Sequence, residues 1–268
     1  MLPLSIGIFI EILVTVALPI GVGYWLNKKK GVTWRVIAYG AVAYFIMQVL
    51  TTIIFVGFSL LVENGTLPMQ DPALRITQVA LSIVLGAVFG VLIRWFGMNK
   101  LKDDLKTLPA TWGIGLGYGG VETMQLVGLP LIGTFWTMLT NINLDPATTS
   151  LSADVVSQLE ELWKVPFYIP LAGSLERIGA MVMHLLVTVL ILQVFKRNNK
   201  WFLAAAIGIE VLVNGLVAGI AEAGLETGWV VLAAVILMAG NLYLLKRLNA
   251  FDLKDGPDED LPDLLPVD

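Results

Sequence analysis

The sequence predicts an all-α polytopic membrane protein, a single bundle of seven transmembrane helices. Three features of the 268-residue chain support this: 57% of its residues are hydrophobic, only 14% are charged, and the mean hydropathy is +0.80. Soluble domains contain about 25% charged and about 45–50% apolar residues. The deficit of charge excludes a soluble globular enzyme, a disordered chain and a nucleic-acid binder, and it makes the lipid bilayer the expected partner.

Seven apolar segments are long enough to cross roughly 30 Å of hydrocarbon, which takes about 20 helical residues. Helices are expected rather than a barrel, because apolar and polar residues do not alternate along these segments. The first segment contains Glu11 and has no basic region before it, so we do not expect a cleaved signal peptide. The seven segments are Leu4–Leu26, Trp34–Val62, Ile76–Phe96, Leu108–Leu139, Val165–Phe195, Trp201–Ile220 and Gly228–Leu245.

The positions of the basic residues predict the orientation of the bundle. Of the 17 Lys and Arg residues, 14 fall in the odd-numbered loops and the C-terminal tail, if Arg94 is counted with the third loop. The even-numbered loops contain only Arg75 and Lys164, and Arg177 lies within the fifth segment. Because loops rich in Lys and Arg remain in the cytoplasm, the N-terminus is predicted outside and the C-terminus inside.

The remaining sequence adds no second folded domain. Residues 1–250 are expected to form a single transmembrane domain, with the informative motifs in 108–220. Within it, 141–164 is predicted to be a polar loop followed by a short amphipathic helix at the interface. Residues 251–268 are acidic and interrupted by proline, which is typical of a disordered cytoplasmic tail.

The apolar segments contain polar side chains that lipid should exclude. Each ionisable group there costs about 2.5–3.5 kcal/mol on insertion scales and is therefore a functional candidate. Glu11 is expected to hydrogen-bond a neighbouring helix, and Glu176 and Arg177 are expected to take part in a structural ion pair. The full set is Glu11, Glu122, Glu176, Arg177, His184 and Glu210, with Gln125 and Asn214 as neutral companions.

Four of these residues are predicted to lie at one depth. At 1.5 Å per residue, Glu122, His184, Glu210 and Asn214 each lie roughly 14–20 Å from the cytoplasmic end of their segments. They come from three consecutive segments, which can meet at mid-membrane. His184 is the only histidine and the chain has no cysteine, so a three-histidine site, a thiolate site and a cysteine nucleophile are excluded.

A glycine-rich run, Gly113 to Gly120, precedes Glu122. It is not a phosphate-binding loop, because no Lys-Ser or Lys-Thr follows it. Small residues allow helix backbones to approach closely, so the run predicts tight packing and would also let a neighbouring helix or an extended peptide approach the carboxylate.

Motifs on three successive segments carry a family resemblance. They are the glycine run with Tyr118 that ends in Val121-Glu122, the Leu175-Glu176-Arg177 segment followed by His184, and Glu210 four residues before Asn214. Together they resemble the bacterial YhfC family of intramembrane metalloproteases, which is related to the CAAX prenyl endopeptidases, PrsW-type proteases and the Aph subunit of gamma-secretase.

The resemblance implies a multi-pass protein of the bacterial plasma membrane that hydrolyses a peptide bond of a membrane-associated substrate. It implies catalytic roles for Glu122, His184, Glu210 and Asn214, supported by Glu176, Arg177 and Tyr118. The family pattern usually has histidine at the positions of Tyr118 and Glu210.

These two departures leave two mechanisms open. In the first, Glu122, His184 and Glu210 ligate zinc, although His₂Glu or three histidines are commoner sets. In the second, no cofactor is needed: Glu122 is the general base, His184 holds the water, Asn214 donates to the oxyanion and a neutral Glu210 assists.

Two functions from other classes remain. A non-catalytic membrane scaffold, or an inactive protease relative, would use the same polar set as a structural core, and it would tolerate both departures. A small transporter would be expected to show paired, inverted broken segments, which the sequence lacks.

Overall fold

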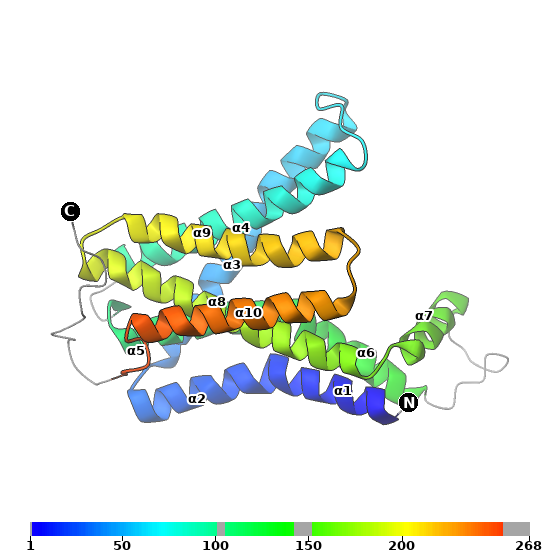
Figure 1. The fold of residues 1–268 in the computed structure, drawn as a ribbon, viewed down its shortest axis with the longest axis horizontal. Coiled ribbons are helices and arrows are strands. Elements are labelled where there is room, and N and C mark those ends of the chain that lie inside the picture. Colours follow the sequence, from blue (N-terminus) through cyan, green and yellow to red (C-terminus); the bar gives the residue numbers. More distant parts are fainter. Residues whose placement is uncertain (1, 101–104, 142–151, 254–268) are drawn as a thin grey trace.

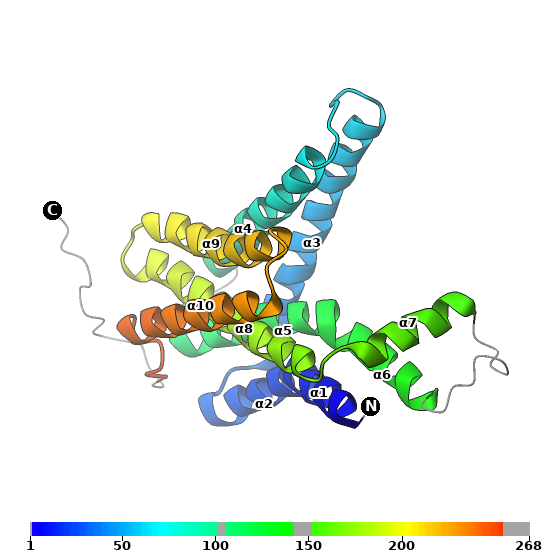
Figure 2. The same ribbon diagram turned by 45° about the vertical axis from the view of Figure 1, so that its right-hand side comes forward.

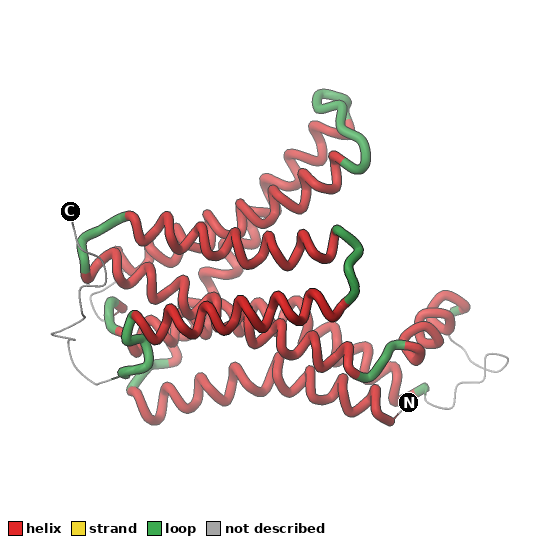
Figure 3. The backbone as a smooth tube through the Cα atoms, viewed as in Figure 1, coloured by secondary structure: helices red, strands yellow, loops and turns green. Residues whose placement is uncertain are grey.

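The computed structural model describes residues 2–100, 105–141 and 152–253, and every regular element within them is a helix (Figures 1 and 3). The predicted all-helical class is therefore confirmed for this part of the chain. The elements are α1 (Leu2–Ile12), the π-helical η1 (Leu13–Ala17), α2 (Leu18–Lys30), α3 (Trp34–Glu63), α4 (Ala73–Lys100), α5 (Leu108–Thr123), the π-helical η3 (Met124–Gly128), α6 (Leu129–Thr140), α7 (Ala153–Lys164), α8 (Tyr168–Lys196), α9 (Trp201–Glu222) and α10 (Thr227–Arg247).

Six helices in the described residues are long and apolar enough to cross a membrane. They are the run from α1 to α2, together with α3, α4, α8, α9 and α10, and their bounds lie within a few residues of six predicted segments. The predicted fourth segment is the helical run α5–η3–α6, which is not among the six. Its glycine run, Glu122 and Gln125 make this stretch less apolar than the other segments.

Helix α8 forms the centre of the bundle. Two thirds (67%) of its most apolar stretch is buried, against 6% for α3, and it contacts α1, α5, α9 and α10. Figures 1 and 2 show α9 on one side of α8, α1 and α2 on the other, α10 crossing in front of α8, and the α3–α4 hairpin leaning away from the bundle. A side chain on the inward faces of α8 is therefore shielded from lipid by several neighbours.

Glycines bring α3 and α5 into backbone contact. A Cβ atom at Gly40 would overlap the carbonyl oxygen of Ile114, and one at Gly117 would overlap the carbonyl oxygen of Ile37. Neither position can hold a larger side chain without moving a backbone. The glycine run therefore packs helices closely, as the sequence predicted.

The helical run that carries Glu122 widens directly after that residue. The π-helical turn η3 begins at Met124, and Pro130 stands at the start of α6, where its missing N–H cannot continue the α-helical ladder. Such wide turns inside helices are frequent at functional sites.

The predicted amphipathic helix after the fourth segment is α7. Ser152 caps it by accepting a hydrogen bond from the backbone N–H of Val155 at 3.4 Å. Leu159 on its apolar face joins a small cluster with Leu4 and Ile8 of α1. The first part of the predicted polar loop, 142–151, and most of the predicted tail, 254–268, lie outside the described residues.

Candidate functional site

Glu122 of α5 and His184 of α8 are in close contact inside the helix bundle. The Oε2 atom of Glu122 lies 2.6 Å from Nε2 of His184. The imidazole side chain is only 2% exposed, whereas 20% of the Glu122 side chain remains accessible. This arrangement holds a buried imidazole against a carboxylate that is open on one side.

The other ring nitrogen of His184 faces a second carboxylate. Its Nδ1 atom lies 3.8 Å from Oε1 of Glu210 on α9. The opposite oxygen of Glu210, Oε2, accepts a hydrogen bond from the Arg94 guanidinium at 2.9 Å. Arg94, Glu210, His184 and Glu122 therefore form one continuous chain of ionisable groups across α4, α9, α8 and α5, which we call the charge network.

Arg94 corrects the sequence analysis, which counted this residue with the third cytoplasmic loop. It lies inside α4 and its side chain is fully buried. Its guanidinium also donates to the carbonyl oxygen of Gly90 at 2.8 Å and to the hydroxyl of Thr188 at 3.2 Å. The sequence contained a signal for this burial, because Arg94 falls within an apolar segment that continues to Phe96. Its closeness to the predicted end of that segment led to its assignment to the loop.

The ring of Tyr118 stacks on the Arg94 guanidinium and packs against His184. Its ring centroid lies 4.1 Å from Cζ of Arg94 and 4.8 Å from the centroid of His184, and Tyr44 packs edge-on at 5.5 Å. Tyr118 is completely buried, and its hydroxyl has no hydrogen-bond partner in the described structure. The position where the family pattern has histidine is thus filled by a ring that packs on the charge network.

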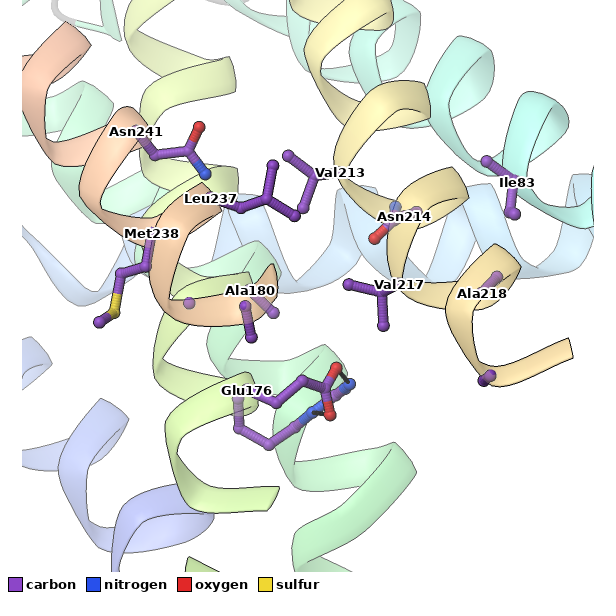
Figure 4. Close-up of a pocket in the computed structure, with 14 residues that line it drawn as sticks. Ile83, Glu176, Ala180, Val213, Asn214, Val217, Ala218, Leu237, Met238 and Asn241 are labelled. Atoms are coloured by element: carbon purple, nitrogen blue, oxygen red, sulfur yellow. Dashed lines mark hydrogen bonds and ion pairs between the residues drawn. The ribbon is translucent and has the colours of Figure 1, made fainter. Parts of the chain in front are cut away.

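Asn214 lies in a different setting from the charge network. With Glu176 and Arg177 it lines a pocket of about 280 Å³ between α8, α9 and α10 (Figure 4). The lining of this pocket does not include Glu122, His184 or Glu210. The structure thus brings together three of the four residues predicted at one depth, and it directs Asn214 elsewhere.

The other ionisable residues of the apolar segments lie outside the charge network. Nε of Arg177 donates to Glu176 at 3.2 Å, so these adjacent residues of α8 pair with each other. Glu11 of α1 is buried against α8, where a Cβ atom at Gly173 would overlap its carboxylate.

Comparison with known proteins agrees with the motifs that meet in this site. The family model for the YhfC intramembrane metalloprotease matches residues 14–237, which include all four members of the charge network. The chain belongs to this family. It is also 25% identical over 209 residues to the "Uncharacterized membrane protein YhfC" of Bacillus subtilis (strain 168), a match that covers 74% of this chain and 77% of the relative. No solved structure matches the chain.

Membership of the YhfC family and the six apolar helices make the chain a multi-pass protein of the bacterial plasma membrane, as the sequence predicted. The family name also implies a metal ion and a peptide substrate. The bacterial relative is itself uncharacterised, so the reaction of this chain has to be argued from its own residues.

The residues present do not fit the zinc site that the sequence analysis considered. The two nitrogens of His184 face different carboxylates, Glu122 and Glu210, and one metal ion can bind only one nitrogen of an imidazole ring. Arg94 already pairs with Glu210 and would repel a divalent cation beside it. Within residues 2–100, 105–141 and 152–253, no group of three His, Cys, Asp or Glu side chains is placed to hold a metal ion.

Proposed function

We propose that this YhfC-family protein is an intramembrane peptidase that hydrolyses a peptide bond of a membrane-associated substrate without a metal ion. The observation that carries the proposal is the 2.6 Å contact between Glu122 and His184, in which the carboxylate stays partly accessible while the imidazole is buried. Family membership supports the reaction class.

In this reaction, Glu122 acts as the general base. Its carboxylate takes a proton from a water molecule whose oxygen attacks the peptide carbonyl carbon. When the C–N bond breaks, the proton on Glu122 passes to the departing amine. His184 holds the Glu122 carboxylate in place through Nε2, so that the carboxylate stays directed at the water during attack.

Glu210 and Arg94 act as positioning residues in this proposal. The Arg94 guanidinium lies 2.9 Å from Glu210 and compensates its charge. The neutral Glu210 of the sequence-based mechanism is therefore not required. The paired carboxylate lies 3.8 Å from Nδ1 of His184, beyond hydrogen-bond distance, so it acts on the ring through its charge.

The proposed topology has seven crossings, with the N-terminus outside and the C-terminus inside, and it includes the run from Leu108 to Thr140. Without Arg94, 13 of the 17 basic residues still fall on the predicted cytoplasmic side. In Figure 1 the end of α2, the start of α5 and the end of α10 lie at the same end of the bundle, opposite the N-terminus and α7. This grouping supports the orientation.

One observation favours a second candidate, a non-catalytic membrane scaffold. Arg94 and Glu210 form a fully buried and well-partnered ion pair, and Tyr118 seals it with an aromatic ring. Such a pair can join helices α4 and α9 without taking part in any reaction. The scaffold and the peptidase differ in whether the accessible carboxylate of Glu122 performs chemistry.

The test is cleavage of a panel of internally quenched transmembrane peptides in proteoliposomes. Cleavage by the wild type should be lost in Glu122→Gln and His184→Ala. The matched control is Glu226→Gln, which changes an exposed carboxylate at the start of α10 in the same way and should leave cleavage unchanged. Cleavage at the wild-type rate by Glu122→Gln would refute the proposal, and loss of cleavage in all three variants would show that the assay reports something else.

A further inference from the structure

The pocket beside the charge network has features of a binding site. It lies between α8, α9 and α10 and combines Glu176, Arg177 and Asn214 with Asn241, a residue that the sequence analysis did not single out. Figure 4 shows the carboxamides of Asn214 and Asn241 on opposing helices around the apolar interior. We call this the α9–α10 pocket.

The buried side-chain N–H group of Asn241 has no hydrogen-bond acceptor in the described structure. Its side chain is only 5% exposed, and its Nδ2 atom is buried without a hydrogen bond in the described structure. Figure 4 shows this nitrogen directed toward the pocket interior near Leu237. An amide N–H in an apolar setting is costly unless an acceptor reaches it, so the pocket is incomplete as it stands.

Depth identifies the chemistry of the missing acceptor. At 1.5 Å per residue, Asn241 lies about 9 Å along α10 from its end at Arg247, well inside roughly 30 Å of hydrocarbon. Acyl chains carry no hydrogen-bond acceptor at this depth, since the ester groups of lipids lie at the boundary. A polypeptide backbone carries carbonyl groups along its whole length and is therefore the better occupant.

The pocket walls allow a backbone to come close. They include Gly179 and Ala180 of α8, Ala218 of α9 and Ala234 of α10, whose small side chains leave room beside the helix axes. A membrane segment must also unwind before a peptidase can cleave it, and the backbone groups that it frees need polar partners. Asn214, Asn241 and the Glu176–Arg177 pair offer donors and acceptors for them.

We propose that the α9–α10 pocket binds an unwound, extended segment of the substrate polypeptide through its backbone, with Asn241 donating to a substrate carbonyl. This inference rests on the proposed peptidase function. Glu176 and Arg177 line the pocket from α8, the helix that also carries His184, so a chain held there lies against the same helix as the proposed site. Asn214 is then a substrate-binding residue.

Photo-crosslinking tests the site without requiring turnover. The full chain carrying Glu122→Gln is placed in phosphatidylcholine nanodiscs with a photoreactive amino acid at position 237 in the pocket. The matched control carries it at position 212, where Leu212 of α9 is 55% exposed and does not line the pocket. The probe is a biotinylated leucine-alanine transmembrane peptide with a Gly-Pro pair at its centre, and the nanodisc lipid carries its own photolabel.

The expected result is several-fold more peptide crosslinking at position 237 than at 212. Adding Asn241→Leu should reduce it to the control level, and so should Ala218→Phe, which fills the pocket from the opposite wall. Equal peptide yields at both positions, capture of labelled lipid alone, or peptide crosslinking that both variants leave unchanged would overturn the proposal. Because Glu122→Gln is inactive by design, this outcome is independent of whether the wild type cleaves any peptide.

Discussion

Oε2 of Glu122 lies 2.6 Å from Nε2 of His184 across the contact between α5 and α8. The contact depends on the glycine run, because a Cβ atom at Gly119 would lie 3.0 Å from Cδ2 of the imidazole. The close packing that the sequence predicted and the polar pair that the structure contains are thus two consequences of the same residues.

Since His184 is the only histidine, its ring nitrogens can be observed without ambiguity in protein grown with isotope-labelled histidine. Glu122→Gln should shift mainly the Nε2 resonance, and Glu210→Gln should shift mainly Nδ1, because each carboxylate faces one nitrogen. Nitrogen NMR of the protein, purified without a histidine tag, measures both. Identical responses of the two nitrogens to the two substitutions would contradict the arrangement.

Arg94→Met should strongly destabilise the fold. Removing one partner of a buried ion pair leaves an unpaired charge, which costs about 3–5 kcal/mol. The double variant Arg94→Met/Glu210→Met should recover much of this loss, since it removes the stranded carboxylate as well. Free energies of unfolding in mixed micelles provide the comparison, and an Arg94→Met variant as stable as the wild type would show that the pair is not formed.

Gly117→Ala should separate α3 from α5. The added Cβ would overlap the carbonyl oxygen of Ile37, and overpacking of this kind costs about 1–3 kcal/mol. Gly208→Ala on α9 is the matched control, because a Cβ atom there meets nothing within 4 Å. The same unfolding measurement should show Gly208→Ala at or slightly above wild-type stability, and equal losses in both variants would argue against close packing at Gly117.

Chelation should leave the protein unaffected. Because the side-chain geometry does not fit zinc, purified protein should contain well under one zinc ion per chain by inductively coupled plasma mass spectrometry. The chelator 1,10-phenanthroline should not reduce peptide cleavage. Stoichiometric zinc that is lost in Glu122→Gln would contradict the metal-independent mechanism and would require His184 and the carboxylates to rearrange around the ion.

Much of the fold could be predicted from the sequence because apolar length alone identifies helices that cross lipid. Six predicted segments correspond to helices that qualify as membrane spans, and the fourth is helical from Leu108 to Thr140. The cap of α7 at Ser152 also has a plain local signal. These features depend on composition and short-range spacing, which a single sequence contains.

The site was harder to predict because it depends on which helices become neighbours. Depth placed Asn214 at the level of His184, but it lines the α9–α10 pocket, whereas Glu210, four residues earlier on the same helix, joins the charge network. The partner of Glu210 was Arg94, on a helix more than 100 residues away along the chain. Helix rotation and long-range pairing depend on packing between distant segments, which periodicity in one segment does not determine.

The central claim is that Glu122 activates water for peptide hydrolysis, and the most direct test follows that water. Wild type and Glu122→Gln are incubated with the same transmembrane peptide in water enriched in heavy oxygen, and the products are weighed by mass spectrometry. The account predicts that the wild type places one heavy oxygen in the new carboxyl terminus, whereas Glu122→Gln yields no product. Labelled product formed equally by both proteins would contradict it.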